Sequence, residues 1–240
     1  MRLKASETTP LNSELESEWK ARGADFVCFV DVSRVNETGH HQLPHAVLIG
    51  MILSQDYLRK VSGTSGYVLN MIHKGQMHED EFHLKEAATD RLADEMAGYL
   101  TSKGYAAYSQ SEKNLCATGC YDEKTRHTPL PHKTVALLAG LGWIGKHDLL
   151  VTQEWGSAVS MCTVLTDAPL NTVARHPVPS QCGDCRICRD ICRAGAIRGN
   201  DWQPGISRDD LVDVWRCTTC LECLVHCPLT QTYMKKRIIR

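Results

Sequence analysis

Eight of the twelve cysteines in this chain lie between residues 182 and 227, in two copies of one spacing pattern. The copies are Cys182-x2-Cys185-x2-Cys188-x3-Cys192 and Cys217-x2-Cys220-x2-Cys223-x3-Cys227, with Pro228 after the second. Two-residue gaps fold the backbone tightly enough to bring three thiolates onto three irons of one 4Fe-4S cluster, and the fourth cysteine binds the neighbouring cluster. The chemistry that this pattern predicts is one-electron transfer through iron and sulfur.

The crossing of the fourth cysteine defines two ligand sets. We predict Cys182, Cys185, Cys188 and Cys227 around a first cluster, and Cys192, Cys217, Cys220 and Cys223 around a second. Zinc sites use paired two-residue knuckles, and disulfide frameworks belong to short secreted chains. The chain begins MRLKASETTP without an apolar run behind it, so we expect no export signal. Two 4Fe-4S clusters are therefore favoured over both alternatives.

Composition limits the remaining possibilities. The 240 residues carry a formal charge of −1, so no net positive field attracts nucleic acid. A membrane-spanning helix needs about 18 or more apolar residues, and the sequence has no such stretch. Many cysteines without an export signal favour a reducing cytoplasm that is poor in oxygen. The basic tail is expected to be a solvated helix end, and it comprises Lys235, Lys236, Arg237 and Arg240.

Three prolines in residues 167–181 mark a domain boundary, because proline interrupts both helices and strands. We predict an α+β domain over residues 1–175, with a mostly antiparallel sheet and helices, and a ferredoxin-like domain over 176–240. Apolar runs predict strands at 24–32, 45–53, 104–109, 148–152 and 157–166. Helices are predicted at 80–103, within 55–74, at 208–214 and at 224–236. The first of these has an apolar stripe of Leu84, Ala88, Leu92, Met96 and Leu100, with Glu86, Asp90, Asp94 and Glu95 in water.

A glycine-rich string, AGLGWIGK, occupies residues 139–146. Gly140, Gly142 and Gly145 match a dinucleotide-binding fingerprint, but no βαβ pattern surrounds them, so a nicotinamide site is not favoured. Glycines also permit close approach of the backbone to a flat ligand. Trp143 would then cover the apolar face of that ligand.

Residues 130–146 (LPHKTVALLAGLGWIGK), Gly156-Ser157, residues 165–170 (LTDAPL) and the first cysteine run resemble the epoxyqueuosine reductases, which are relatives of the reductive dehalogenases. The resemblance is good over about residues 104–195 and looser elsewhere. It implies a cobalamin-reductase/nitroreductase-like domain fused to the two-cluster domain, with the clusters feeding electrons to a corrinoid cobalt. The corrinoid-binding residues that it implies are Gly140, Leu141, Gly142, Trp143, Gly145 and Lys146.

The chain departs from the family pattern in several places. Arg126 stands where the family has an acidic residue thought to protonate the substrate, and an arginine is a permanent cation. His132 and Lys133 occupy the place of a Glu-Arg pair, and Arg193 follows Cys192 where proline is usual. We find no counterpart of the helical extension with which the family contacts tRNA, so tRNA is not an expected partner.

Histidines could replace the missing acid. His127 and His132 flank Pro129 and Pro131, and an imidazole titrates near neutrality, which suits a general acid. The alternative for each is a hydrogen-bonded loop histidine. A solvated loop is likewise favoured over a metal site for His40, His41 and His45.

The four other cysteines have structural interpretations. Cys28 and Cys162 lie in apolar strands, where cysteine behaves as a small hydrophobe. Cys116 and Cys120 form a C-x3-C pair, and we favour a structural role over a third metal site or a redox-labile pair.

The charges near the two cysteine runs differ. Arginines surround the first run, whereas Glu222 is the only charge inside the second. Positive charge stabilises the reduced form of a cluster, so we predict that the first cluster is the easier to reduce. The arginines are Arg186, Arg189, Arg193 and Arg198.

The sequence favours a cytoplasmic iron-sulfur protein without a membrane association, a corrinoid-dependent reductase whose two 4Fe-4S clusters deliver single electrons to a cobalamin. One alternative is a ferredoxin-like electron-transfer module that has no substrate of its own and reduces a partner corrinoid protein or reductase. A second alternative is epoxyqueuosine reduction in tRNA modification. The expected electron donor is a ferredoxin or flavodoxin.

Overall fold

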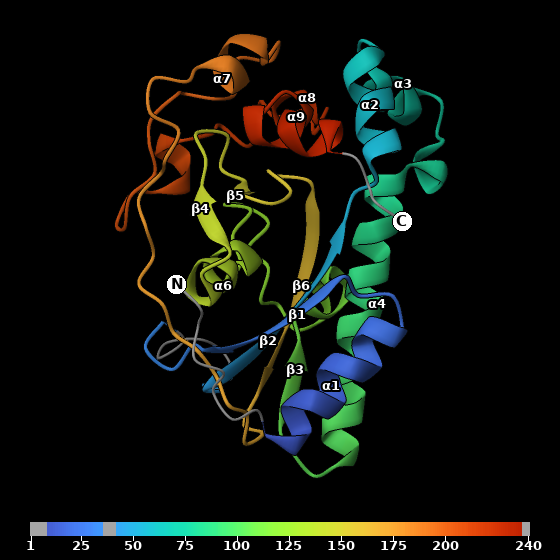
Figure 1. Cartoon of the computed structure of the whole chain (residues 1–240), viewed down its shortest axis with the longest axis vertical. Coiled ribbons are helices and arrows are strands. Elements are labelled where there is room, and N and C mark those ends of the chain that lie inside the picture. The colour runs from blue at the N-terminus through green and yellow to red at the C-terminus, as the bar shows by residue number, and fades with distance from the viewer. Residues whose placement is uncertain (1–8, 36–41, 237–240) are drawn as a thin grey trace. The chain divides into compact units, whose positions relative to one another are not determined.

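The computed structural model describes residues 9–35 and 42–236 (Figure 1). The chain divides into two compact units, each assembled from three segments: Met1–Met51, Glu86–Ala139 and Met161–Arg175 in the first, and Ile52–Lys85, Gly140–Ser160 and His176–Arg240 in the second. The last division between them falls after Arg175. The second unit also includes two segments that the sequence pattern assigned to the larger domain. His40, His41, Arg237 and Arg240 lie outside the described residues.

The first unit contains a four-stranded sheet with the strand order β1-β2-β6-β3. Its strands are β1 (Phe26–Asp31), β2 (His45–Ile52), β3 (Ala107–Ser109) and β6 (Val159–Thr166). β1 pairs antiparallel with β2, and β3 pairs antiparallel with β6. The chain therefore has the mixed helix and sheet architecture that the sequence indicated, and the nitroreductase-like assignment stays a prediction.

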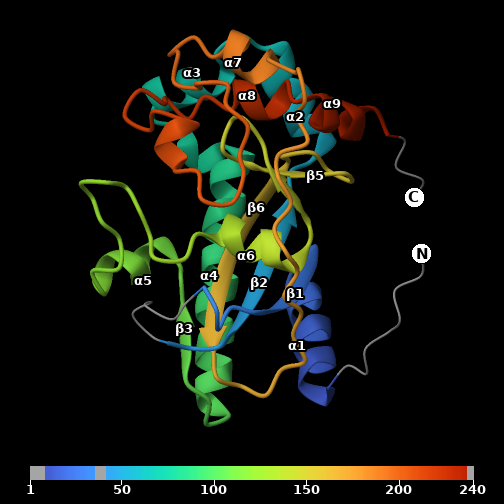
Figure 2. The same ribbon diagram turned by 90° about the vertical axis from the view of Figure 1, so that its left-hand side faces the viewer.

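Helices cover both faces of this sheet. α1 (Pro10–Ala21) and α4 (Glu81–Ser102) share one apolar core with the sheet, whereas α6 (His132–Ala139) packs on the other side of β1, in front of the sheet in Figure 2. α5 (Glu112–Ala117) follows β3. α1 was not predicted, although Thr9 caps it by accepting a hydrogen bond from the Asn12 N–H, and Pro10 suits the first helical position. Large side chains in the shared core include Leu15, Trp19, Ile49, Leu92, Met96 and Leu100.

The predicted stripe of α4 is correct only in its second half. Leu92, Met96 and Leu100 are buried, but Leu84 is 51% exposed, because the core meets the helix only from Thr89 onward. Asp90 was expected in water and is instead partly buried, and this burial raises the pKa of its carboxyl. The stripe therefore begins about one turn later than the pattern indicated.

The second unit is built from short elements. Its helices are α2 (Gln55–Gly63), α3 (Tyr67–His73), η1 (Met77–Glu79), α7 (Ile187–Ile191), η2 (Arg208–Asp210), α8 (Glu222–Val225) and α9 (Pro228–Lys235). β4 (Gly142–Ile144) and β5 (Leu150–Thr152) form an antiparallel hairpin. A separate apolar cluster joins α2, α8 and α9 through residues such as Leu58, Val61, Leu224, Val225 and Met234.

Three helix predictions in this unit need adjustment. The segment 55–74 forms two helices with a break between Gly63 and Gly66, where interruption was expected. Residues 208–214 hold only a single 3-10 turn. The helix predicted at 224–236 is split, because Pro228 has no N–H to continue a helix and instead starts α9. Within the described ranges, no helix is both long and apolar enough to span a membrane.

Candidate metal centre

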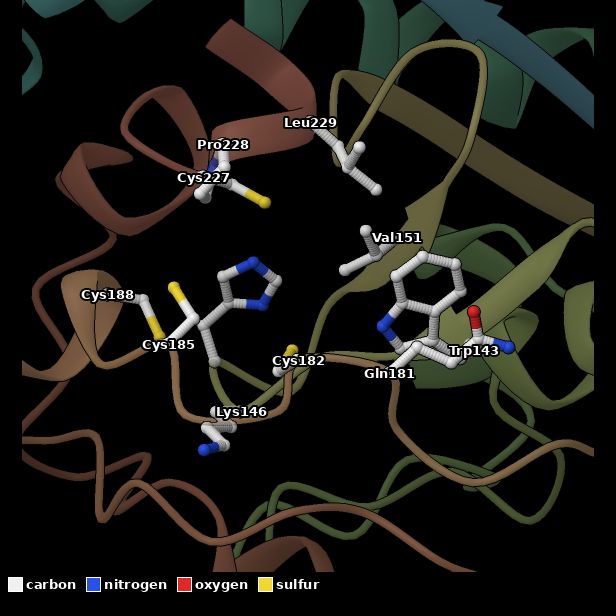
Figure 3. Close-up of a pocket in the computed structure, with 11 residues that line it drawn as sticks. Trp143, Lys146, Val151, Gln181, Cys182, Cys185, Cys188, Cys227, Pro228 and Leu229 are labelled. Carbon is white, nitrogen blue, oxygen red and sulfur yellow. The ribbon is translucent and has the colours of Figure 1, made fainter. Parts of the chain in front are cut away.

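Four cysteines line one cavity of about 200 Å³ in the second unit. Three belong to the first run, Cys182, Cys185 and Cys188, and Cys227 ends the second run. Figure 3 shows their sulfur atoms around a common space. The structure thus brings together the four residues that the spacing predicted for the first cluster.

Local backbone structure places each of these sulfurs. Cys182 and Cys185 close a turn, in which the Cys185 N–H donates to the Cys182 carbonyl at 3.1 Å and Gly183 adopts a φ of +53°. Cys188 lies on α7, directly after this turn. Cys227 precedes α9 as its N-cap, so Pro228 fixes the direction in which the chain leaves the cavity. The two-residue gaps therefore serve the tight turn, and the last cysteine arrives from a different helix.

Burial affects the titration of these thiols. It raises the pKa of Cys188 to about 11, and the neighbouring Cys182, Cys185 and Cys227 raise that pKa further. Burial also raises the pKa of Cys227. A metal must therefore displace protons to bind here, and its positive charge would then stabilise the thiolates.

The four cysteines predicted for the second cluster also interact with one another. Burial raises the pKa of the Cys223 thiol, and Cys220, Cys217, Cys188 and Cys192 raise it further through their charges. All four predicted ligands are thus close enough to interact electrostatically. α7, which carries Cys188, packs against α8, which carries Cys223, so the two sets are neighbours, as electron transfer between two clusters requires.

The donor set fits a cluster. Within residues 9–35 and 42–236, no group of three or more His, Cys, Asp or Glu side chains is arranged to hold a single metal ion. A 4Fe-4S cube is wider than one ion and takes four thiolates around its outside. Four thiols around one hollow, with a second group of four beside them, match that requirement.

The C-x3-C pair lies in the first unit, whereas both cysteine sets lie in the second. Cys116 is exposed, whereas Cys120 is buried. Burial raises the pKa of Tyr108 to about 12, and a hydrogen bond with Cys120 contributes to this rise. Cys120 therefore packs against a tyrosine, which favours the structural interpretation of the pair. Burial similarly raises the pKa of Cys28 to about 11 and that of Cys162.

The AGLGWIGK string runs from the last residue of α6 through a turn to β4, the first strand of the β4–β5 hairpin. Gly140 has a φ of +77° after the end of α6. A Cβ at Gly142 would overlap the Val151 carbonyl, and one at Gly145 would lie 2.8 Å from Val151 Cγ2. The glycines therefore allow the two strands of the hairpin to pack against each other. The expectation that the string also makes room for a flat ligand stays a prediction.

Two of the corrinoid-binding residues implied by the resemblance are buried side chains. Trp143 is only 5% exposed. The Lys146 ammonium donates to the Gly183 carbonyl at 2.6 Å and lies 3.6 Å from the Asp201 carboxylate. Gly140 is exposed, and Leu141 and Gly142 are half-buried, so corrinoid binding at this string stays a prediction.

The hairpin forms a second wall of the cysteine cavity. Trp143, Lys146, His147 and Val151 line the same cavity as the four cysteines. The Leu149 N–H donates to His147 Nδ1 at 3.2 Å, so the proton of this ring lies on Nε2, which faces Ser157 Oγ at 3.3 Å. Nothing in the sequence marked His147, because its role depends on a hairpin that brings it beside residues about 40 positions away.

The candidate proton donors lie in the first unit. His132 is half-buried at the start of α6, with Nδ1 2.9 Å from Thr163 Oγ1. Burial lowers its pKa to about 4, so at pH 7 the ring is neutral and a poor acid. His127 is exposed, and its backbone bonds to that of Asp122. Arg126, also exposed, has a φ of +53°. His45 Nδ1 lies 2.8 Å from the Ala168 carbonyl, which is a structural contact.

The arginines near the first run have their own partners. Arg189 forms an ion pair with Asp190 at 2.9 Å, and Arg198 donates to the Asp209 carbonyl. Arg193 donates to Ser65 Oγ at 2.8 Å. Lys146, whose side chain is 7% exposed, is a more buried cation beside these cysteines. The predicted difference in reduction potential between the two clusters therefore cannot rest on the arginines alone.

Comparison with known proteins agrees with this geometry. The family described as 4Fe-4S dicluster domain matches residues 181–231. The epoxyqueuosine reductase of Synechococcus sp. (strain CC9605) is 49% identical over 71 residues, which cover 30% of this chain and 22% of that protein. The epoxyqueuosine reductase of Escherichia coli (strain K12) is 42% identical over 69 residues, covering 29% of this chain and 18% of that protein. The matched segments are thus a minor part of these relatives.

Solved structures extend the likeness in fold. An epoxyqueuosine reductase from Streptococcus thermophilus has a TM-score of 0.53 at 16% identity and covers 92% of this chain and 66% of that one. A catabolic reductive dehalogenase has a TM-score of 0.54 at 19% identity, with coverage of 87% and 30%. At such identities the likeness shows the fold alone. Together with the dicluster match, the comparisons identify the chain as an iron-sulfur protein that is similar to the epoxyqueuosine reductases.

Proposed function

We propose that the protein is an iron-sulfur oxidoreductase in which two 4Fe-4S clusters pass single electrons to an acceptor. The observation that supports this most strongly is the ring of four thiols, Cys182, Cys185, Cys188 and Cys227, around one cavity. The second cluster would bind to Cys192, Cys217, Cys220 and Cys223. Each cluster supplies one-electron chemistry when bound. An electron donor of the ferredoxin or flavodoxin type belongs to the same proposal.

The chain's own residues orient the first site and line it with apolar side chains. Lys146 holds the Gly183 carbonyl, which fixes the turn that carries Cys182 and Cys185. Trp143, Val151 and Leu229 supply apolar walls. Rigid, apolar surroundings limit the structural change that accompanies each electron transfer. They also contribute to the reduction potential of the cluster.

The proposed acceptor is a corrinoid, and the residues that the resemblance implies for it are those of the 139–146 string. A structurally similar reductive dehalogenase, with a TM-score of 0.51 at 19% identity, is described in terms of B12-dependent dehalogenation. Its coverage is 82% of this chain and 27% of that one. The alternative without a corrinoid is a ferredoxin-like module that reduces a partner protein.

Epoxyqueuosine reduction is the second candidate function. The relatives that share 42–49% identity over their matched segments carry that name. One structurally similar epoxyqueuosine reductase was solved with an epoxyqueuosine-modified tRNA stem loop, at a TM-score of 0.53 and 17% identity. Against this candidate, Arg126 is an exposed cation where the resemblance implies an acid. A proton donor for this reaction would have to be a different group.

Anaerobic reconstitution tests the proposal. The protein is purified without oxygen, supplied with iron, sulfide and cobalamin, desalted, and analysed for iron and by visible and EPR spectroscopy. We expect about eight irons per chain and two reducible clusters. The variant Cys185→Ser should disturb one cluster, while Cys116→Ser, which replaces an exposed cysteine outside the runs, should keep both.

The outcomes separate the candidates. Retained corrinoid supports the reductase, and clusters without corrinoid support the electron-transfer module. Fewer than about six irons per chain would contradict the two-cluster assignment itself. Release of queuosine from epoxyqueuosine-containing tRNA by the reduced, cobalamin-loaded protein would favour the second candidate.

A further inference from the structure

Trp143 carries a buried hydrogen-bond donor without a partner. Among the described residues, its Nε1 is the buried side-chain nitrogen or oxygen for which no hydrogen-bond partner is found. The indole N–H of a buried tryptophan normally finds an acceptor, and leaving a donor unsatisfied costs about 1–3 kcal/mol. Such an exception needs an explanation, and an acceptor that arrives with a bound group is one.

The surroundings of this N–H point to the kind of acceptor. Trp143 lines the cavity that the four cysteines of the first set surround. Figure 3 shows its indole nitrogen on the cavity side of the ring, toward Cys182. A group bound in this cavity would present cysteine thiolates and sulfides, which are negatively charged hydrogen-bond acceptors.

The ring has little freedom to turn away. Trp143 pairs with Val151 across the β4–β5 hairpin, and only 5% of the residue is exposed. Gly142 permits this register, because a Cβ there would overlap the Val151 carbonyl. The indole is therefore held in place before any ligand binds, so little conformational entropy is lost when its hydrogen bond forms.

We propose that the Trp143 Nε1–H donates a hydrogen bond to a sulfur atom of the cluster held by Cys182, Cys185, Cys188 and Cys227, and that this bond raises the reduction potential of that cluster. The inference rests on the proposed binding of two clusters. One-electron reduction adds negative charge to the cluster and makes its sulfurs better acceptors, so the hydrogen bond stabilises the reduced state more than the oxidised one. The electron comes from an external reductant, and no covalent bond changes.

The second set has a different neighbour. The side chain of Glu222, next to Cys223, is 11% exposed and accepts a hydrogen bond from the Gly66 N–H. A carboxylate beside a cluster opposes the negative charge that reduction adds. The two clusters therefore differ in potential, with the first cluster the easier to reduce, because of a hydrogen bond on one side and a carboxylate on the other.

Isotope labelling tests the contact directly. The full chain is produced with ¹⁵N-indole tryptophan, reconstituted anaerobically and partly reduced, and the cluster signals are examined by pulsed EPR for coupling to ¹⁵N. We expect one cluster to show a ¹⁵N coupling that disappears in Trp143→Phe, which keeps an aromatic ring but removes the N–H. The matched control is Trp202→Phe, in the same unit but outside the cavity lining, and it should retain the coupling.

A redox titration measures the consequence. Trp143→Phe should make one-electron reduction of one cluster about tenfold less favourable, which corresponds to a midpoint about 59 mV lower. The affected signal should be the one that Cys185→Ser disturbs, and Trp202→Phe should leave both midpoints unchanged.

Each outcome is decisive. Two intact clusters without any ¹⁵N coupling in the labelled wild type would overturn the inference while leaving the proposed function standing. Loss of the coupling without a shift in either midpoint would overturn the effect on potential. Iron well below about eight per chain would instead remove the proposed function, and the inference with it. If Trp143→Phe does not hold its clusters, the coupling in the labelled wild type still decides whether the contact exists.

Discussion

The first unit wraps a four-stranded sheet and the 22-residue helix α4 around a continuous apolar core, whereas the cysteine-bearing helices α7, α8 and α9 of the second unit have only five, four and eight residues. Helices this short are not stable alone, because nucleation costs more than a few hydrogen bonds return. These short helices carry predicted cluster ligands at or near their ends, such as Cys192 after α7 and Cys227 before α9. The comparison suggests that apolar burial organises the first unit, and that the cysteine-rich part of the second depends on its clusters.

Removal of the clusters should give the largest effect. Metal binding in structural zinc sites supplies on the order of 10 kcal/mol of folding free energy, and four-thiolate cluster binding should act in the same direction. We expect cluster-free protein to lose amide protection across residues 182–235 while α1, α4 and β6 keep theirs. Hydrogen exchange followed by mass spectrometry compares the two states. Equal protection of the cysteine-rich segment with and without iron would show that this segment does not depend on its clusters.

The complementary change is made in the apolar core. Leu100 is fully buried on α4, and truncation of such a side chain costs about 2–5 kcal/mol. Leu100→Ala should lower the unfolding free energy of the first unit by this amount and leave the iron content unchanged, as measured by denaturant-dependent hydrogen exchange and iron assay. Leu84→Ala, on the same helix but 51% exposed, should change stability by less than about 0.5 kcal/mol. Loss of iron in Leu100→Ala would show that iron binding in the second unit depends on the stability of the first.

A backbone contact in the second unit gives a slightly smaller effect. Gly156 has a φ of +60°, and a Cβ there would overlap the backbone and hydroxyl of Thr230 at the start of α9. Gly156→Ala should therefore cost about 3–4 kcal/mol, from overpacking together with left-handed strain. It should also make iron binding weaker, because α9 follows Cys227. Iron retention during titration with a chelator measures this change.

Gly205→Ala is the matched control for that variant. Gly205 has a φ of +94°, but no atom lies within 4 Å of the Cβ it would gain. Only the backbone strain of about 1–2 kcal/mol remains. Equal losses in the two variants would show that the Thr230 contact has no role in holding the cluster site.

The two regions also differ in how much the sequence could predict. The cysteine spacing encodes local turns, so two ligand sets can be predicted from the sequence alone, and the fold places the first predicted set around one cavity. The AGLGWIGK string has the glycine pattern of a loop around a ligand, yet Gly142 and Gly145 face Val151. A glycine pattern shows where a backbone must come close to something, but not to what. That information lies in a pairing with β5, which no local pattern specifies.

Charges were the hardest feature to predict. The sequence showed that arginines surround the first run, but it could not show that Arg189 and Arg198 have polar partners in the fold. His132 looked like a general acid because of its type, whereas its burial could only be seen once α6 was placed. Environment decides the pKa of such a group, and environment is a product of the tertiary structure.

His132 allows the smallest of these effects to be predicted, and it concerns the first unit. Burial lowers the pKa of its imidazole from about 6.5 to about 4. Between these values the unfolded chain takes up a proton that the folded chain does not, so stability is complete above about pH 6.5 and falls as the pH drops toward 4. The full shift corresponds to about 3 kcal/mol, and partial exposure of the residue reduces the expected loss to about 2 kcal/mol.

The measurement is the unfolding free energy of the first unit at pH 7, 6, 5 and 4.5, from hydrogen exchange of its core amides. His132→Gln cannot take up a proton, so this variant should lose most of the decline over that range, whereas His127→Gln replaces an exposed histidine and should retain it. The expected decline belongs to residues of the first unit because His132 contacts Thr163 on β6. A decline of equal size in His132→Gln would assign the acid sensitivity to other groups, and the difference between the units would then rest on core packing and clusters alone.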